Sequence, residues 1–204
     1  SFTWCATVVW GTPTVTERLA ILEQMFLAAL DVHNEELANQ CLSRIHHYLR
    51  STVGEDSSSA RIQRLVALQK ESMEDYDGAL EIYDTLLHEN PANSSCYQRK
   101  YAIFKAQVGK EVEAMEALNS YLSIQNQGDA AAWFEMANLC TNVGDYKGAT
   151  YCYEELVLLQ PQDASLHCML GELYLMMGSS SSLLSNLILA RKHIALSLEL
   201  SGDS

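Results

Sequence analysis

The chain has 204 residues, of which 48% are hydrophobic, and its formal net charge at pH 7 is -13. This apolar content is enough for a sizeable core and excludes wholesale disorder. The acidic balance argues against nucleic-acid binding, because a binder must neutralise phosphates with clustered Lys and Arg. It also argues against direct adsorption on anionic lipid. Leu and Ala are the most frequent residues and only 3 Pro occur, which favours helix.

No apolar run approaches the ~20 residues that a membrane span needs. The first residues, SFTWCATVVWG, lack the basic region of a signal peptide. We therefore expect a soluble chain that reaches a membrane only through partners. The 6 Cys form no CxxC pair and have no His at zinc-ligand spacing. We expect most of them to be buried, reduced thiols.

Residues 1–16 are predicted to be an irregular lead-in, because one short β-like run has no partner strand. Thr14 or Thr16 can cap the helix that follows. The first helical hairpin is predicted at about 17–50, with its turn at 31–34. The turn contains His33 and no Gly, and no Pro closes this hairpin, so its pattern is degenerate. A polar connector at 51–59 is predicted to be a mobile surface loop.

Hairpins are also predicted at about 60–93, 95–127, 129–161 and 162–201. Four positions of the 60–93 hairpin recur 70 residues later, or two steps of 35: Tyr76, Ala79, Tyr83 and Pro91 return as Tyr146, Ala149, Tyr153 and Pro161. The 95–127 hairpin follows the same step at Ala102, Gly109 and Ala114. The last hairpin carries a Ser-rich insertion near 179–186, where an insertion at a turn is tolerated.

This order of an aromatic, a small residue, a Gly turn, Ala, an aromatic and Pro resembles the tetratricopeptide repeat. The resemblance predicts an all-α fold: a tetratricopeptide-repeat solenoid of about four helical hairpins, winding as a right-handed superhelix. Residues 17–201 are predicted to form this single solenoid. One hairpin cannot bury its apolar face alone, so neighbours must stack. Small residues at Ala67, Ala102, Ala137 and Gly171 are expected to allow close helix approach.

Catalytic motifs are missing from the sequence: it has no GxGxxG, GxxxxGK[ST] or GxSxG. His46-His47 has no carboxylate or Cys at ligand spacing and fits a solvated helix end. Glu154-Glu155 fits a solvated face beside packed residues. We therefore predict a binding protein that is not an enzyme and has no cofactor and no metal.

The resemblance also places a partner-binding groove on the first helix of each hairpin. Transferred by repeat position, the groove residues are Arg61, Arg64, Leu68, Arg99, Ile103, Phe134 and Asn138. Three arginines on one part of a groove favour recognition of a partner's carboxylates, because guanidinium forms bidentate hydrogen bonds. The alternative is that they pair with local acids such as Glu71 or Glu74. Leu68, Ile103 and Phe134 are expected to offer apolar surface to a partner.

Tetratricopeptide co-chaperones clamp the acidic C-terminus of heat-shock chaperones with a Lys and an Asn of one repeat. Asn138 matches the Asn, but Phe134 replaces the Lys, and Arg64 and Arg99 lack the Asn. The clamp is incomplete. A soluble adaptor or co-chaperone that binds peptide segments is therefore the alternative function.

A closer resemblance extends over residues 17–200. Its segments include MFLAALDVHNEELANQCL, RIQRLVALQKESMEDYDGALEIYDTLLHENPAN and AAWFEMANLCTNVGDYKGATYCYEELVLLQP. They are similar to the subunit 2 family of the endoplasmic reticulum membrane protein complex. The resemblance implies a non-catalytic scaffold, peripheral on the cytoplasmic face of that membrane. It would support insertion of transmembrane segments of tail-anchored and multipass proteins. The implied partners are membrane-embedded subunits and a soluble cytosolic subunit.

Overall fold

The computed structural model describes residues 14–52, 59–124, 126–177 and 183–202. Within these ranges the chain forms ten helices and no strand, which confirms the predicted all-α, tetratricopeptide-type fold. The helices are α2 (Val15–Asp31), α3 (Glu35–Thr52), α4 (Ala60–Ser72), α5 (Tyr76–Glu89), α6 (Ser94–Ala106), α7 (Glu111–Ser123), α8 (Ala130–Val143), α9 (Tyr146–Leu159), α10 (Ala164–Met176) and α11 (Leu183–Gly202). None of these helices is both long and apolar enough to cross a bilayer.

The helices pack in consecutive pairs, α2 with α3 through α10 with α11. The described residues thus hold five hairpins, one in each predicted range and one more than the predicted number of about four. Most of the predicted lead-in and connector, and the first part of the Ser-rich insertion, lie outside the described residues. The right-handed superhelix and the single solenoid stay predictions.

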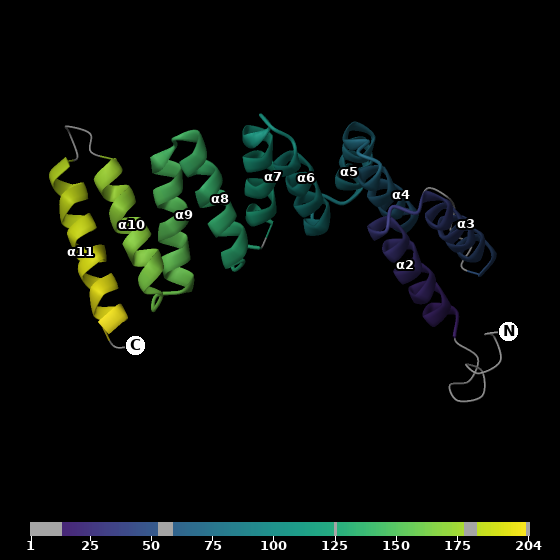
Figure 1. Ribbon diagram of the computed structural model, residues 1–204, viewed down its shortest axis with the longest axis horizontal. Coiled ribbons are helices and arrows are strands. Elements are labelled where there is room, and N and C mark those ends of the chain that lie inside the picture. Colours follow the sequence, from purple (N-terminus) through teal and green to yellow (C-terminus); the bar gives the residue numbers. More distant parts are fainter. Residues whose placement is uncertain (1–13, 53–58, 125, 178–182, 203–204) are drawn as a thin grey trace. The chain divides into compact units, whose positions relative to one another are not determined.

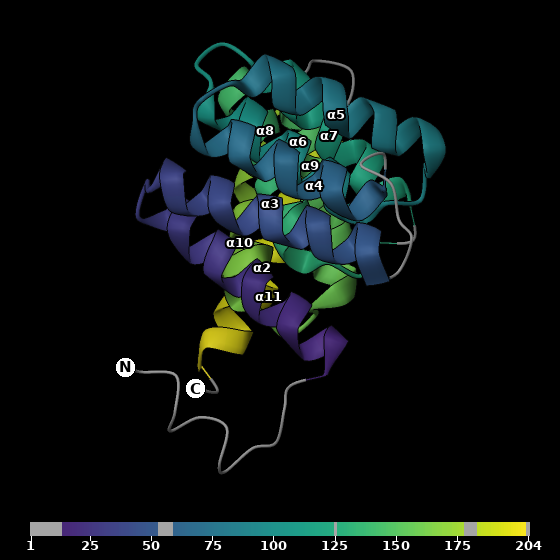
Figure 2. The same cartoon turned by 90° about the vertical axis from the view of Figure 1, so that its right-hand side faces the viewer.

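Two compact units divide the chain, Ser1–Pro91 and Ala92–Ser204. In the first unit, α4 packs on its partner α5 and on both helices of the preceding hairpin. Figure 2 shows α5, α4, α3 and α2 one below the other. In the second unit, α6 to α11 stand side by side in chain order, and α8 and α10 each pack on the second helix of the preceding hairpin (Figure 1).

Short polar side chains begin many of the helices. Thr14 caps α2 in a capping box: its hydroxyl accepts from the Glu17 N–H, and the Glu17 carboxylate accepts from the Thr14 N–H at 2.7 Å. Asp75 and Asp145, which are 70 residues apart, each accept a hydrogen bond from the N–H three residues on, at 3.1 Å. The repeated sequence pattern therefore reflects repeated helix capping.

The turns inside four hairpins use a left-handed residue. His33 has φ 53° and Glu74 has φ 61°, while Gly109 and Gly144 have φ 86° and 84°. Only glycine adopts this region without steric cost. His33 therefore stands at the position that glycine occupies in the more regular repeats. The turn is the same, but a residue with a Cβ is strained there.

Each unit has its own core of buried apolar side chains. Phe26, Ala38 and Ile45 are fully buried in the first unit, and α4 adds Ile62 and Leu65 to the same cluster. The second core runs through α7 to α11 and includes Trp133 and Tyr153. Ala67 and Ala137 are fully buried, as expected of small residues at helix crossings. Ala102 is exposed, so the prediction that it lies at such a crossing was wrong.

Candidate binding surfaces

The predicted groove residues of the first unit lie on α4. Arg61 is half exposed, and its Nε lies 2.6 Å from the Glu23 carboxylate of α2. The exposed pair contributes at most about 1 kcal/mol. Arg64 is exposed one turn further on, and Leu68 is partly buried against the core of this unit. Arg61 thus has a local acid as its partner, although not one of the two acids named from the sequence.

Arg99 and Ile103 lie on α6 in the second unit. Arg99 is exposed, whereas Ile103 is only 2% exposed. The expectation that Ile103 offers apolar surface to a partner is therefore corrected: its side chain packs in the interior. Arg99 belongs to a different unit from Arg61 and Arg64, so the proposed convergence of the three arginines stays a prediction.

Phe134 and Asn138 lie one helical turn apart on α8. The Phe134 ring is 42% exposed and meets the buried Tyr153 ring edge to face, with centroids 6.3 Å apart. Asn138 is partly buried. Packing against Tyr153 fixes the orientation of Phe134 while leaving much of its ring accessible, which suits an apolar contact point.

Glu135, the residue after Phe134, belongs to a polar cluster of α6 and α8 that was not predicted. Tyr101 and Lys105 both donate to the same Glu135 oxygen at 2.7 Å. The Glu135 carboxylate raises the pKa of Lys105, and the pKa of Glu135 itself is lowered by the Lys105 and Tyr101 hydrogen bonds. The cluster ties the first helices of two hairpins together and gives their face a fixed charge pattern.

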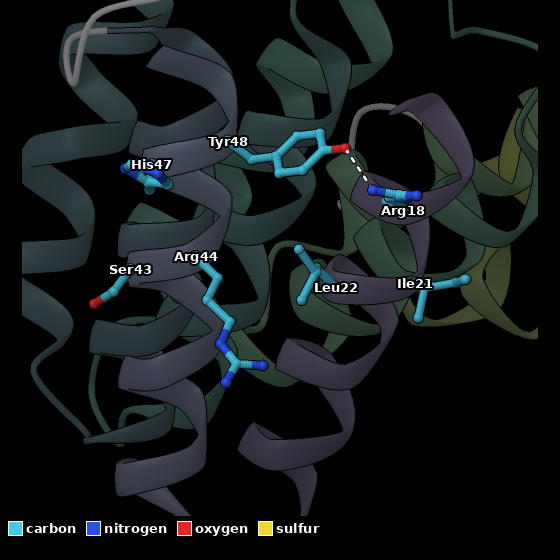
Figure 3. Close-up of a pocket in the computed structure, with 7 residues that line it drawn as sticks. All are labelled: Arg18, Ile21, Leu22, Ser43, Arg44, His47 and Tyr48. Carbon is cyan, nitrogen blue, oxygen red and sulfur yellow. Dashed lines mark hydrogen bonds between the residues drawn. The ribbon is translucent and has the colours of Figure 1, made fainter. Parts of the chain in front are cut away.

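A hollow of about 530 Å³ lies on α2 and α3 and was not predicted. We call it the α2/α3 hollow; it is lined by Arg18, Ile21, Leu22, Ser43, Arg44, His47 and Tyr48. Figure 3 shows Arg44 and Tyr48 extending from α3 toward α2, and the Tyr48 hydroxyl accepts from Arg18 at 3.5 Å. Its signal in the sequence was Arg18-Ile21-Leu22 and Arg44-His47-Tyr48, each at helical spacing.

A second hollow of about 430 Å³ lies over α7, α8 and α9. Its wall includes Trp133 and Tyr151, whose rings meet edge to face with centroids 5.8 Å apart. Cys140 and Cys152 also border it, but burial raises the pKa of Cys152 to about 12. That thiol stays protonated near neutral pH and is a poor nucleophile.

The described residues contain no group of three or more His, Cys, Asp or Glu placed to hold a metal ion. A titratable cluster of the described residues joins α9, α10 and α11 and consists of His167, His193, Tyr174 and Glu154. His167 is 3% exposed, and its Nε2 lies 3.1 Å from the Pro161 carbonyl oxygen. These groups are occupied with one another, which favours a packing role.

Comparison with known proteins gives a family match over most of the chain. The family model described as EMC2 TPR-like repeat domain matches residues 21–187. The chain is 39% identical over 184 residues to ER membrane protein complex subunit 2-B of Xenopus laevis, covering 90% of this chain and 58% of that protein. It is 29% identical over 180 residues to TPR repeat protein oca3 of Schizosaccharomyces pombe, covering 88% and 60%. The chain thus spans less than two thirds of these relatives.

Solved structures share the fold at low sequence identity. MamA 41-end from Desulfovibrio magneticus RS-1 aligns with a TM-score of 0.56 and 15% identity, covering 94% of this chain and 99% of that one. At this identity the likeness concerns the fold alone.

Proposed function

Because the chain belongs to the family of EMC2 TPR-like repeat domains, matched over residues 21–187, we propose that it is a scaffold subunit of the endoplasmic reticulum membrane protein complex. It is non-catalytic and peripheral on the cytoplasmic face of the membrane. It holds membrane-embedded subunits and a soluble subunit together. Through them it supports the insertion of transmembrane segments of tail-anchored and multipass proteins.

The family match carries this proposal. It extends from α2 to α11 and so includes helices of all five hairpins in the described part of the chain. Stacked hairpins present extended surfaces, so binding is their natural activity. The chain also exposes side chains of the kind that form interface anchors, including Arg64 and Phe134.

The groove residues proposed to touch partners directly are those with accessible side chains: Arg61, Arg64, Leu68, Arg99, Phe134 and Asn138. The arginines would bind partner carboxylates and Phe134 would enter an apolar pocket. Ile103 is left out because it is buried, and it would support the surface from beneath.

The test is co-purification of the affinity-tagged chain from detergent-solubilised membranes, with partners identified by mass spectrometry. We expect recovery of multipass subunits of the complex together with a soluble subunit. Recovery of a heat-shock chaperone without any multipass subunit would overturn the proposal in favour of the soluble adaptor.

Charge reversal then tests the groove. Recovery of the subunits with the double variant Arg64→Glu/Arg99→Glu is expected to fall roughly tenfold or more. Glutamates at these positions would repel the partner carboxylates that the arginines are proposed to bind. Lys147→Glu/Arg191→Glu is the control of equal charge change, since both side chains are exposed on second helices, α9 and α11. Equal recovery with the double variant and the control would remove the arginines from the groove while leaving the scaffold proposal standing.

A further inference from the structure

The α2/α3 hollow combines apolar surface with positive charge. Ile21 is 53% exposed in its wall, and Met25, one turn further along α2, is 43% exposed. Large apolar side chains in a row on one helix face usually mark a surface that another element covers.

The repeat register identifies what kind of surface this is. Ile21 precedes the left-handed residue His33 by the same number of residues as Ile62 precedes Glu74 and Ala132 precedes Gly144. Ile62 is 4% exposed and Ala132 is 7% exposed. Ile62 is buried in the cluster that the preceding hairpin, α2 and α3, forms with α4. The hollow is therefore the stacking face of a repeat, and in α2 this face is open among the described residues.

The inner repeats also show what covers such a face. In the second unit the second helix of the preceding hairpin lies on it: α7 packs on α8, and α9 packs on α10. The cover on α10 contributes a carboxylate, because the Tyr174 hydroxyl of α10 donates to Glu154 of α9. An amphipathic helix with acidic residues beside its apolar stripe is thus a cover that the fold already uses.

The charge of the hollow selects the same kind of helix. Two of its seven lining residues are arginines, Arg18 and Arg44, and none is acidic. In the whole chain Asp and Glu outnumber Lys and Arg by 26 to 13. A positively charged apolar hollow on an acidic protein would favour a partner with carboxylates and repel one with a basic face.

We propose that the α2/α3 hollow docks an amphipathic, acidic α-helix of a partner protein. Apolar side chains of that helix cover Ile21 and Leu22, and its flanking carboxylates bind the guanidinium groups of Arg18 and Arg44. The helix completes the stack as α9 does on α10. This inference does not rest on the proposed function, since it names the chemistry of the partner and not the assembly to which that partner belongs.

A second copy of the chain is a weaker match. The last described helix of such a copy, α11, also exposes apolar side chains, with Leu184 74% and Leu198 68% exposed. That helix carries Arg191 and Lys192 but only one acid, Glu199, so it would bring like charge to the hollow. Residues 1–13 of the chain contain no Asp or Glu and cannot supply the carboxylates either.

The test measures fluorescence anisotropy of two labelled synthetic helices with the purified 204-residue chain. Each peptide has about 20 residues, enough to span α2, and a Leu stripe at helical spacing. One has Glu beside the stripe and the other has Lys at the same positions. We expect the Glu peptide to bind roughly tenfold or more tightly than the Lys peptide, and added salt to reduce the difference.

Two variants locate the binding. Arg44→Glu is expected to weaken binding of the Glu peptide roughly tenfold and to strengthen binding of the Lys peptide. Ile21→Asp is expected to weaken binding of both peptides. Lys147→Glu on α9 is the control of equal charge change and should leave both affinities unchanged. Circular dichroism confirms that each variant is folded, and both substituted side chains are exposed in the native chain.

Three results would overturn the proposal. The first is no saturable binding of the Glu peptide at about 100 μM, and the second is equal affinity of both peptides for the native chain. The third is self-association in analytical ultracentrifugation that Ile21→Asp abolishes, because the hollow would then be occupied by a second copy.

Discussion

His167 and His193 stack on each other across α10 and α11, with their Nδ1 atoms 3.1 Å apart and their ring centroids 5.3 Å apart. The Pro161 carbonyl can only accept, so Nε2–H of His167 donates to it. A neutral His167 then accepts at Nδ1 from the Nδ1–H of His193. The pair can hold one extra proton in this arrangement, but two would place an N–H against an N–H.

This pair predicts that the last hairpin weakens in mild acid. Burial lowers the pKa of His193 below its ordinary value of 6.5, the electrostatic effects of His167 and Lys192 act in the same direction, and that of Glu154 opposes them. A lowered histidine pKa means that the unfolded chain takes up the proton first. The part of the hairpin's stability that is linked to His193 is therefore fully present above pH about 6.5 and is lost as the pH falls through the folded pKa. Hydrogen-exchange protection factors in α10 and α11, which are corrected for the pH dependence of the intrinsic exchange rate, should therefore fall over this range.

The matched variants are His193→Gln and His88→Gln. His193→Gln removes the group that titrates, so the fall in protection factors between pH 7.5 and 5.5 should disappear. His88 is exposed on α5, and its replacement should leave the pH dependence intact. An unchanged pH profile in His193→Gln would show that another group causes the effect.

Thr14→Ala should destabilise the first unit by about 1 kcal/mol, because it removes the hydroxyl of the capping box on α2. The sequence left Thr14 and Thr16 as alternative caps. Thr16 lies inside the helix, where its hydroxyl is 3.1 Å from that of Thr14, so Thr16→Ala should cost less. Urea unfolding of the two variants distinguishes them, and an equal loss would contradict the assignment.

Local rules explain how much of this structure the sequence could predict. Hairpin positions followed from the 35-residue step because Asp caps and left-handed turns recur with it, at Asp75 and Asp145 for example. Two of the predicted close helix approaches also followed, since Ala67 and Ala137 are fully buried. The first hairpin, with His33 in place of Gly, follows no 35-residue step, and its predicted range came from its apolar spacing and polar turn instead.

Repeat position alone could not determine which side chains are accessible. Ile103 and Phe134 hold groove positions by the same rule, yet one is 2% and the other 42% exposed. Accessibility depends on the neighbouring side chains, which differ between repeats. The α2/α3 hollow and the His167–His193 pair were not predicted for a related reason. Each lies between two helices, and the sequence does not show which residues of one helix lie opposite those of the other.

Burial predicts the order in which the described cysteines react. Cys41, Cys96, Cys140 and Cys152 are buried, and Cys168 is partly exposed. Desolvation also raises the pKa of Cys140 and of Cys152, which lowers their thiolate fraction. N-ethylmaleimide at pH 7.5, read for each cysteine by mass spectrometry, should label Cys168 first and the other four only in urea. Early labelling of Cys152 would contradict its buried position.

The left-handed turn residues predict opposite effects of exchanging glycine with other residues. Glu74→Gly should stabilise the first unit by about 1 kcal/mol, because φ 61° strains any residue with a Cβ. Gly144→Ala should destabilise the second unit by about as much. No atom lies within 4 Å of the added Cβ, so the loss would come from the backbone alone. Gly128→Ala is the control, since its surroundings are equally open and its φ is not in the left-handed region. Urea unfolding of the three variants checks this, and a loss at Gly128 equal to that at Gly144 would refute the account.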